Sequence, residues 1–328
     1  MKITYLIPFS FVCGGLRVVF EQANRLQDRG HEVKIVSLQE DQGWFPLKAE
    51  FVKVPCFEGH IPESDILIAT FNTTVRPAYE SGRGIPFYLI QGYESLFYED
   101  KAYQAQCEES YRLPLVHLYV SNWLKDLIET RFGQKGYLIS NGIDLKRFRP
   151  SPPLLSGPKK RILMTYSPFG LKNCQDGILA FKLVREKLPD IELIMFGASP
   201  PPATDFPYTY FYNPPQEDIP KIYSSSDCLT FPSLAEGFGL PPLEAMACGC
   251  PVITTDCGGV RDFAKDEETS LLVPTRKPAE MAKAIIRLLT DESLRKKLIE
   301  KGLLTAKRFS WDKVIDRLEH NFKKSLDR

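Results

Sequence analysis

The stretch Ser233–Gly259, SLAEGFGLPPLEAMACGCPVITTDCGG, decides how the fold is interpreted. Apolar segments typical of strands stand at both ends, and an acidic, glycine-containing loop lies between them. Pro241 and Pro242 suit the first turn of a helix, and Gly249 suits its end. We therefore expect a strand, a loop, a helix and a second strand in succession. The N–H groups at the start of such a helix form a site for an anion such as a diphosphate.

The rest of the chain shows the same alternation of strand-like and helix-like segments. Segments with a helical period, among them 16–29, 121–132 and 176–187, separate the apolar runs. Strands are expected at 2–8, 32–38, 65–70, 86–91, 116–121, 136–140, 161–166, 191–197, 228–233 and 251–256. Strands that alternate with helices favour parallel sheets with helical crossovers. The predicted fold class is α/β, with two Rossmann-like doubly wound sheets.

The domain boundary is expected in RPSPPLLSGPKK at 149–160, which is rich in Pro, Gly and Ser. This places an N-terminal Rossmann-like domain at 1–150, a linker at 151–160 and a second Rossmann-like domain at 161–308. A C-terminal helix at 309–328 is expected to pack back toward the first domain. Ligands of such sheets bind beyond the carboxyl ends of the strands, so both domains should present their strand-to-helix turns to a central cleft.

Composition narrows the classes of function. The net charge of +1 argues against a nucleic-acid partner. No apolar run is long enough to cross a bilayer and the start of the chain has no cleavage site, so a cytoplasmic protein is expected. The eight cysteines show no CxxC spacing and are expected to be small buried hydrophobes rather than zinc ligands.

The C-terminus is basic. Over 295–328, Lys and Arg outnumber Asp and Glu by 11 to 5. Two interpretations remain open here. The segment either makes peripheral contact with the anionic inner face of a membrane, or it is a solvated helix whose apolar residues dock onto the body of the protein.

Glu236 and Glu244 differ in what they indicate. A carboxylate in the first turn of a helix is favourable whatever the function, so Glu244 has a structural explanation. Glu236 precedes a Gly-Phe-Gly turn for which no packing role is obvious, and an acidic loop at a strand end favours contact with a ligand. At Gly14 and Gly15 a second glycine turn begins a helix, and a structural turn and a contact with phosphate or acceptor both remain open.

At 223–259 the segment YSSSDCLTFPSLAEGFGLPPLEAMACGCPVITTDCGG closely resembles the donor-site signature of the GT-B glycosyltransferases of family 4, in which two glutamates bracket seven residues. Similar stretches occur in order along nearly the whole chain: CGGLRVVFEQANRLQDRGHEV, YVSNWLKDLI, SNGIDLKRFRP and LKNCQDGILAF. The resemblance implies a retaining, metal-independent enzyme that needs no cofactor. It would transfer a hexosyl or deoxyhexosyl group from a nucleoside-diphosphate sugar to a hydroxyl of a glycan or lipid-linked glycan.

The resemblance also implies roles for individual residues. Glu244 would accept hydrogen bonds from the ribose hydroxyls, and Glu236 would lie beside the transferred sugar. Lys172 would neutralise the departing diphosphate, with Gly15 contributing from the first domain. This makes Glu236 and Lys172 the expected catalytic residues. The sugar and the diphosphate would be held by N–H groups around Gly237, Phe238, Gly239 and Leu240.

Two departures from the family pattern stand out. No arginine occurs between Arg161 and Arg185, although the family usually carries one near the lysine. Gln91 stands where a histidine is common, and it cannot ionise. The pattern IQGYESLFY resembles a bacterial subgroup that builds rhamnose-containing surface polysaccharides. In that subgroup Glu94 is a candidate for contact with the acceptor or sugar, like Gly14 and Gln91, and the alternative for Glu94 is a residue of a surface turn.

The function expected from these features is glycosyl transfer in the synthesis of cell-surface polysaccharide. Two alternatives are a nucleotide-sugar epimerase of the same architecture and a non-catalytic partner subunit that binds sugar nucleotides.

Overall fold

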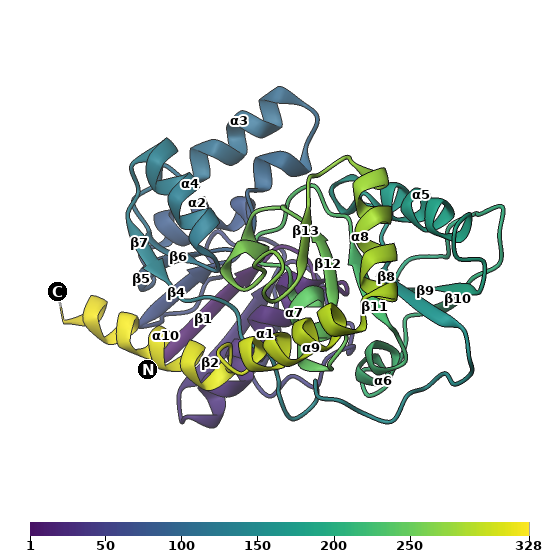
Figure 1. Cartoon of the computed structure of the whole chain (residues 1–328). Helices are drawn as coiled ribbons and strands as arrows, with labels where there is room; N and C mark the ends of the chain where they lie inside the picture. Colours follow the sequence, from purple (N-terminus) through teal and green to yellow (C-terminus); the bar gives the residue numbers. More distant parts are fainter. Residues whose placement is uncertain (328) are drawn as a thin grey trace. The chain divides into compact units, whose positions relative to one another are not determined.

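The computed structural model describes residues 1–327, which form two compact units (Figure 1). Unit 1 consists of Met1–Gly142 together with the chain from Trp311 onward. Unit 2 is the continuous segment Ile143–Ser310. Each unit has its own parallel sheet and its own helices, so each is described separately.

Unit 1 contains a seven-stranded sheet in the order β3-β2-β1-β4-β5-β6-β7. All neighbouring strands pair in parallel. The strands are β1 (Lys2–Ile7), β2 (Glu32–Ser37), β3 (Glu50–Lys53), β4 (Ile66–Ala69), β5 (Ile85–Ile90), β6 (Val116–Tyr119) and β7 (Gly136–Leu138). The helices of this unit are α1 (Gly14–Asp28), α2 (Asn72–Ser81), the 3-10 turn η1 (Glu94–Phe97), α3 (Lys101–Ser110), α4 (Asn122–Phe132) and α10 (Trp311–Leu326).

Unit 2 repeats this plan with a six-stranded parallel sheet in the order β10-β9-β8-β11-β12-β13. Its strands are β8 (Lys160–Thr165), β9 (Ile191–Gly197), β10 (Thr209–Tyr212), β11 (Cys228–Phe231), β12 (Val252–Thr255) and β13 (Leu271–Val273). Between them lie η2 (Gly170–Lys172), α5 (Cys174–Arg185), α6 (Ile219–Ser224), α7 (Leu240–Ala247), η3 (Gly259–Asp262), α8 (Pro278–Thr290) and α9 (Glu292–Ala306).

In each sheet the strand order reverses once. The reversal lies between β1 and β4 in unit 1, and between β8 and β11 in unit 2. The loops that follow two such strands diverge and leave a crevice at their carboxyl ends, which is where doubly wound sheets bind ligands. The topology therefore predicts ligand sites at the loops after β1 and β4, and at the loops after β8 and β11.

The predicted fold class is confirmed, and the long apolar runs form the strands expected of them. Ser121 caps α4, since its Oγ accepts a hydrogen bond from the N–H of Leu124 at 3.2 Å. Strands β3, β10 and β13 were not predicted. Each has only three or four residues, and β3 and β10 lie at sheet edges where their side chains are largely half-buried or exposed. β3 and β10 lack the continuous apolar run that marks a buried strand, and β13 is apolar but only three residues long.

The boundary between the units differs from the predicted one at 150. Residues 143–160, including the segment 151–160 expected as a linker, belong to unit 2. The N–H of Ile143 donates to the carbonyl of Phe309 at 2.8 Å. The N–H of Leu154 donates to Ser225 Oγ at 2.8 Å. These bonds tie an irregular, proline-rich segment to the unit, which its composition alone does not reveal.

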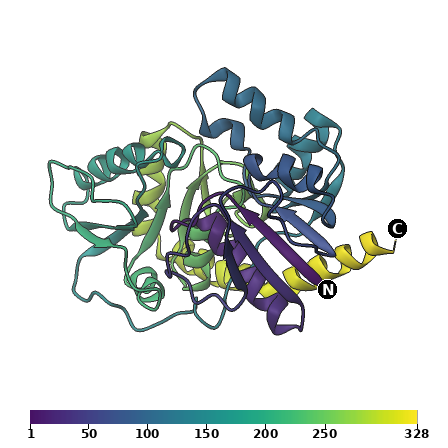
Figure 2. The same cartoon turned by 180° about the vertical axis from the view of Figure 1, so that it is seen from behind.

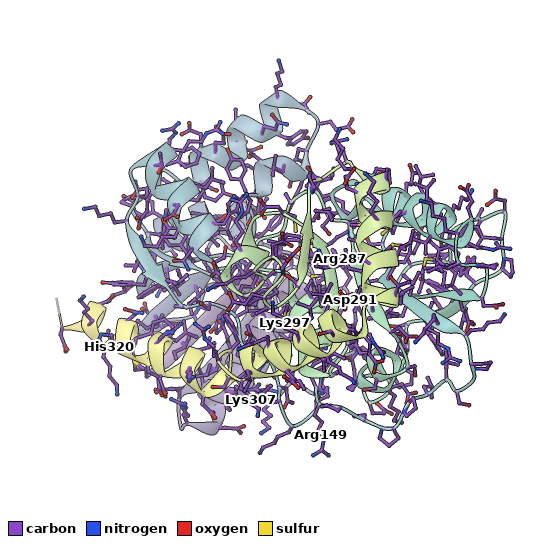
Figure 3. The ribbon with its side chains drawn as sticks, viewed as in Figure 1. Arg149, Arg287, Asp291, Lys297, Lys307 and His320 are labelled. Atoms are coloured by element: carbon purple, nitrogen blue, oxygen red, sulfur yellow. The ribbon has the colours of Figure 1, made fainter. Side chains whose placement is uncertain are left out.

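The basic C-terminal segment is divided between the two units. Figure 3 shows Lys297 and Lys307 along α9 and just past its end, in unit 2, whereas His320 lies on α10 of unit 1. Figures 1 and 2 both show α10, in yellow, running past the N-terminus. The apolar face of α10 is buried in unit 1 through Trp311, Val314, Ile315, Leu318 and Phe322. Among the residues described, no helix combines the length and apolar character that a membrane crossing requires.

Candidate functional site

The loops at the reversal of the unit 2 sheet bring Lys172 and Glu236 together. Lys172 ends η2, which follows β8, and Glu236 follows β11. The N–H of Leu234 donates to the carbonyl of Leu171 at 2.7 Å, which ties the two loops to each other. Two residues that are 64 positions apart in the sequence thus meet at the point where the topology predicts a ligand.

Lys172 and Glu236 form an ion pair. Lys172 Nζ lies 2.7 Å from Glu236 Oε1, and Ser233 Oγ donates to the same oxygen at 2.7 Å. The side chain of Glu236 is only 10% exposed, whereas that of Lys172 is 37% exposed. The carboxylate is therefore fixed, and the lysine side chain is partly exposed along its length while its ammonium group is buried against Glu236.

Lys172 carries a positive charge in this setting. Burial alone would lower its pKa, but the negative charge of Glu236 and the hydrogen bond to it outweigh burial, so that the pKa is raised. A charged ammonium group beside a carboxylate can exchange that partner for an incoming phosphate. The ion pair holds the ammonium group in place.

The turn after Glu236 presents backbone N–H groups. Glu236 itself is fixed by a bond from its N–H to the carbonyl of Cys257 at 2.7 Å and by a bond from the N–H of Gly259 to its carbonyl at 2.8 Å. Within residues 1–327, the N–H groups of 237–240 have no hydrogen-bond acceptor. Such N–H groups at a helix start are an anion site.

Gly239 is required by this geometry. Its φ is 92°, and a Cβ there would lie 2.7 Å from Val260 Cγ1. The helix α7 then begins with Leu240, followed by Pro241 and Pro242, which have no N–H. The donors therefore come mainly from the turn rather than from the first turn of the helix, which refines the expectation drawn from the sequence.

The expectation that the Gly-Phe-Gly turn has no packing role is wrong. The Phe238 side chain is 3% exposed. Its ring packs against Phe263 at a centroid distance of 5.4 Å and against Phe309 at 5.8 Å. Phe238 therefore anchors the turn in the core, while its N–H remains available.

Glu244 lies in α7 and is held by a buried tyrosine. Tyr223 Oη donates to Glu244 Oε2 at 3.0 Å. Burial, followed by the charge of Glu244, raises the pKa of Tyr223 well above its ordinary value, so that the hydroxyl remains a donor. This bond orients the carboxylate.

In unit 1, Gly15 and Gln91 lie against each other. A Cβ at Gly15 would be 3.4 Å from Gln91 Nε2, whereas a Cβ at Gly14 would meet nothing within 4 Å. Gln91 Oε1 is a buried acceptor with no hydrogen-bond partner in the described chain. The start of α1 also has no side-chain cap. The structure therefore brings together two of the residues named for unit 1, Gly15 and Gln91, and it leaves an acceptor atom unsatisfied there.

Glu94 is not a residue of a surface turn, since it is 2% exposed. Its carboxylate accepts hydrogen bonds from the N–H of Asn72 at 2.7 Å and from Tyr88 Oη at 3.1 Å. It thereby caps α2. Burial raises the pKa of Glu94 to about 8, although both hydrogen bonds oppose the shift. The geometry places it among core groups, and its predicted contact with sugar or acceptor remains a prediction.

Three further residues of the site were not assigned roles from the sequence. Ser233 stands three positions before Glu236 at a strand end, which is a usable local signal. Tyr223 is 21 positions from Glu244, and only the fold reveals their contact. Arg261 lies on η3, which follows directly from the backbone bridge between Glu236 and Gly258, and it pairs with Asp256 at 2.5 Å. Among the described residues no group of three or more His, Cys, Asp or Glu is placed to hold a metal ion.

Comparison with protein families gives a match to the model described as "Glycosyl transferases group 1", over residues 149–305. Among curated proteins, a D-inositol 3-phosphate glycosyltransferase of Salinispora arenicola is 39% identical over 107 residues, which cover 32% of this chain and 24% of that protein. The corresponding enzyme of Paenarthrobacter aurescens is 31% identical over 194 residues, covering 53% of this chain and 48% of that protein. The chain thus matches between about a quarter and a half of the length of these relatives.

Solved structures resemble the chain along its whole length. A sucrose-phosphate synthase from Thermosynechococcus elongatus superposes with a TM-score of 0.80 at 17% identity, covering 99% of both chains. Anabaena HepE in complex with UDP-glucose gives a TM-score of 0.80 at 14% identity, covering 99% of this chain and 100% of that one. At such low identity these likenesses show the fold alone. Residues 149–305 are thus similar to the glycosyl transferases group 1 family, and the whole chain has the two-domain fold of these solved glycosyltransferase structures.

Proposed function

We propose that this protein transfers a sugar from a nucleoside-diphosphate donor to a hydroxyl of a glycan or glycolipid, with retention at the anomeric carbon. The observation that carries the proposal is the Lys172–Glu236 pair beside the acceptor-free N–H groups of 237–240. A cation, a fixed carboxylate and a row of N–H donors suit a sugar linked to a diphosphate. The complex of the structurally similar HepE with UDP-glucose supports this donor class.

In the proposed reaction the bond between the anomeric carbon and the phosphate oxygen breaks, and the diphosphate leaves with the electron pair. Lys172 and the N–H groups of the turn stabilise the negative charge that develops there. The acceptor oxygen attacks the same face of the sugar and forms the new bond. Its proton passes to the departing phosphate oxygen. Glu236 holds Lys172 and lies beside the transferred sugar, and Glu244 receives the ribose hydroxyls.

Unit 1 is proposed to bind the acceptor through the region of Gly15 and Gln91. The unpartnered Gln91 Oε1 can accept a hydrogen bond from a hydroxyl, and the uncapped start of α1 can receive a phosphate oxygen. The pattern IQGYESLFY supports a role in rhamnose-containing surface polysaccharides. Basic side chains of α9 and α10 are proposed to make peripheral contact with an anionic membrane face.

The donor is tested with a thermal-shift panel of nucleotide sugars, because a ligand that binds only the folded state raises its apparent stability. We expect a shift with at least one nucleoside-diphosphate sugar. A shift with dTDP-rhamnose but not with UDP- or GDP-linked sugars supports the rhamnose subgroup. No shift with any donor contradicts the proposal.

The two glutamates are expected to separate binding from chemistry. Glu236→Ala should lower release of nucleoside diphosphate from the donor about 100-fold or more, because Lys172 is no longer held, with nucleotide affinity changed less than about threefold. Glu244→Ala should weaken nucleotide binding about tenfold or more, because charged hydrogen bonds to ribose are lost. Glu280→Ala, at an exposed glutamate of α8, is the matched control. Unchanged activity and affinity in both variants would contradict the assignment.

A further inference from the structure

Unit 1 exposes a row of phenyl rings at the carboxyl edge of its sheet. The row consists of Phe9 and Phe11 after β1, Phe71 after β4 and Phe97 after β5. Phe9 stacks on Phe11 with centroids 4.4 Å apart, Phe9 meets Phe71 at 5.5 Å, and Phe71 stacks on Phe97 at 6.5 Å. Loops far apart in the sequence thus build one continuous aromatic row. The site described above makes no use of it.

Two of these rings are exposed to water and the other two, Phe9 and Phe71, are half-buried. Phe11 is 48% exposed and Phe97 is 38% exposed. Val12 and Leu96, which neighbour Phe11 and Phe97 in the sequence, are aliphatic and are 37% and 43% exposed. Contiguous apolar surface of this kind marks a binding site more often than scattered exposed residues do.

The backbone under the row is held firmly. Ser10, between Phe9 and Phe11, is fully buried, its N–H donates to Gln39 Oε1 at 3.1 Å, and its carbonyl accepts from Trp44 Nε1 at 2.8 Å. The N–H of Phe71 donates to Thr74 Oγ1 at 3.2 Å. The rings are therefore presented by a fixed scaffold, which reduces the entropy lost when a ligand binds.

The row continues into the region proposed for the acceptor. Gly92 follows Gln91 directly, and a Cβ at Gly92 would lie 3.1 Å from the Phe97 ring. The buried Gln91 Oε1, which has no partner in the described chain, thus belongs to the residue next to the glycine on which the last ring lies. An apolar row beside an unsatisfied hydrogen-bond acceptor matches a molecule with an apolar chain and a hydroxyl-bearing head.

The chemistry of the row favours an alkyl chain over a second sugar. All four rings are phenylalanine, and neither these rings nor Val12 and Leu96 carry a hydrogen-bonding group. A polar sugar ring buried against them would lose its hydration without replacement, which costs free energy. An alkyl chain has no hydrogen bonds to water that it could lose, and its transfer out of water is favourable in free energy.

We propose that the aromatic row, Phe9, Phe11, Phe71 and Phe97, binds the alkyl chain of a lipid-linked acceptor. The apolar site is inferred from the geometry of unit 1 alone. That its ligand is the acceptor rests on the proposed function. It narrows the acceptor from any glycan or glycolipid to one with a hydrocarbon chain near the hydroxyl that is glycosylated.

The test measures the affinity of the whole protein for n-alkyl β-D-glucopyranosides from methyl to octyl, below their micelle concentrations, by titration calorimetry. We expect Kd to fall about fourfold for each added methylene group. Phe11→Ser and Phe97→Ser should flatten this dependence, and because both side chains are exposed, the variants should keep the parent unfolding temperature. Tyr79→Ser, at a 42% exposed tyrosine of α2 outside the row, should keep the dependence.

Equal affinity for methyl and octyl glucosides, or an unchanged dependence in the Phe11 and Phe97 variants, would overturn the proposal. So would loss of binding to phosphatidylcholine vesicles in these variants without any chain-length dependence, because the row would then be a membrane-contacting surface. UDP affinity is measured on the same samples. A chain-length dependence without UDP binding would leave the apolar site standing and reject the proposed donor chemistry instead.

Discussion

At the scale of single residues, Glu94 is a carboxyl group in the core of unit 1 with a pKa raised to about 8. Between pH 4.5 and 8 the folded protein holds a proton that the unfolded chain releases. Raising the pH through this range should therefore lower the free energy of unfolding, by on the order of 5 kcal/mol. Glu94→Gln should remove this contribution, because the amide does not ionise.

The measurement is urea denaturation of the parent protein and of Glu94→Gln at intervals from pH 5 to 9. Burial also lowers the pKa of His117 to about 4, which stabilises the fold as pH rises toward 6.5. His117 is present in both proteins, so the difference between them isolates Glu94. Glu109→Gln, at an exposed glutamate, is the control. Identical pH dependences in parent and Glu94→Gln would show that Glu94 is ionised in the fold.

Single residues also differ in how far their role can be predicted from the sequence. Glu236 could be named from its loop, because a carboxylate at a strand end before a glycine turn has few packing uses. The burial of Phe238 in the core could not be predicted from the sequence, because the rings that it contacts, Phe263 and Phe309, lie 25 and 71 positions away. The burial of Glu94 depends in the same way on packing by other elements.

At the scale of elements, α10 stabilises unit 1 through its apolar face. The ring of Phe322 is fully buried and meets Phe87 of β5 at a centroid distance of 5.1 Å. On the polar side, Glu319 pairs with Arg29 at 2.7 Å and with His31 at 2.8 Å. The helix is thus an integral part of a unit whose other residues end at Gly142.

Phe322→Ala should lower the free energy of unfolding by about 3–5 kcal/mol, since it leaves a cavity against β5. Leu326→Ala, in the same helix at a side chain that is 42% exposed, should cost less than about 1 kcal/mol. Urea denaturation followed by circular dichroism measures both. A loss of less than about 1 kcal/mol in the free energy of unfolding of both variants would mean that α10 contributes little to the stability of unit 1.

Elements also differ in how well the sequence predicts them. Central strands such as β9 have continuous apolar runs, because both faces of a parallel sheet are covered. Edge strands such as β3 and β10 lack such runs, and they are defined by pairing with a neighbour. The cap at Ser121 is a local feature, because its hydroxyl lies only three residues before the N–H group that it accepts from.

At the scale of the whole molecule, the chain leaves unit 1 after residue 142 and returns at Trp311. Ile143 and Ser310 bridge each other where it crosses. The segment 143–310 should therefore fold alone with one cooperative transition. The shorter segment 161–308, which matches the domain predicted from the sequence, lacks Phe309 and the bonds of 143–160.

We expect the segment 161–308 to be less stable than 143–310 by about 3 kcal/mol or more, because Phe238 loses an aromatic partner and buried backbone groups lose theirs. The segment 161–308 should also bind UDP more weakly than 143–310, since the turn after Glu236 is anchored through Phe238. Urea denaturation and calorimetry of the two segments provide the comparison. Equal stability would show that the contacts of 143–160 and Phe309 are dispensable.

The sequence by itself determined the α/β class, the repeated Rossmann-like plan and the glutamate loop, because hydrophobic periodicity, helix caps and glycine turns act over a few neighbouring residues. Only the tertiary structure decided the unit boundaries, the burial of Glu94 and Phe238, the Lys172–Glu236 pair and the aromatic row. Each of these depends on segments distant in the chain meeting at a sheet edge or in a core. Burial and pairing there belong to the packed arrangement of several elements, and no single stretch of sequence specifies them.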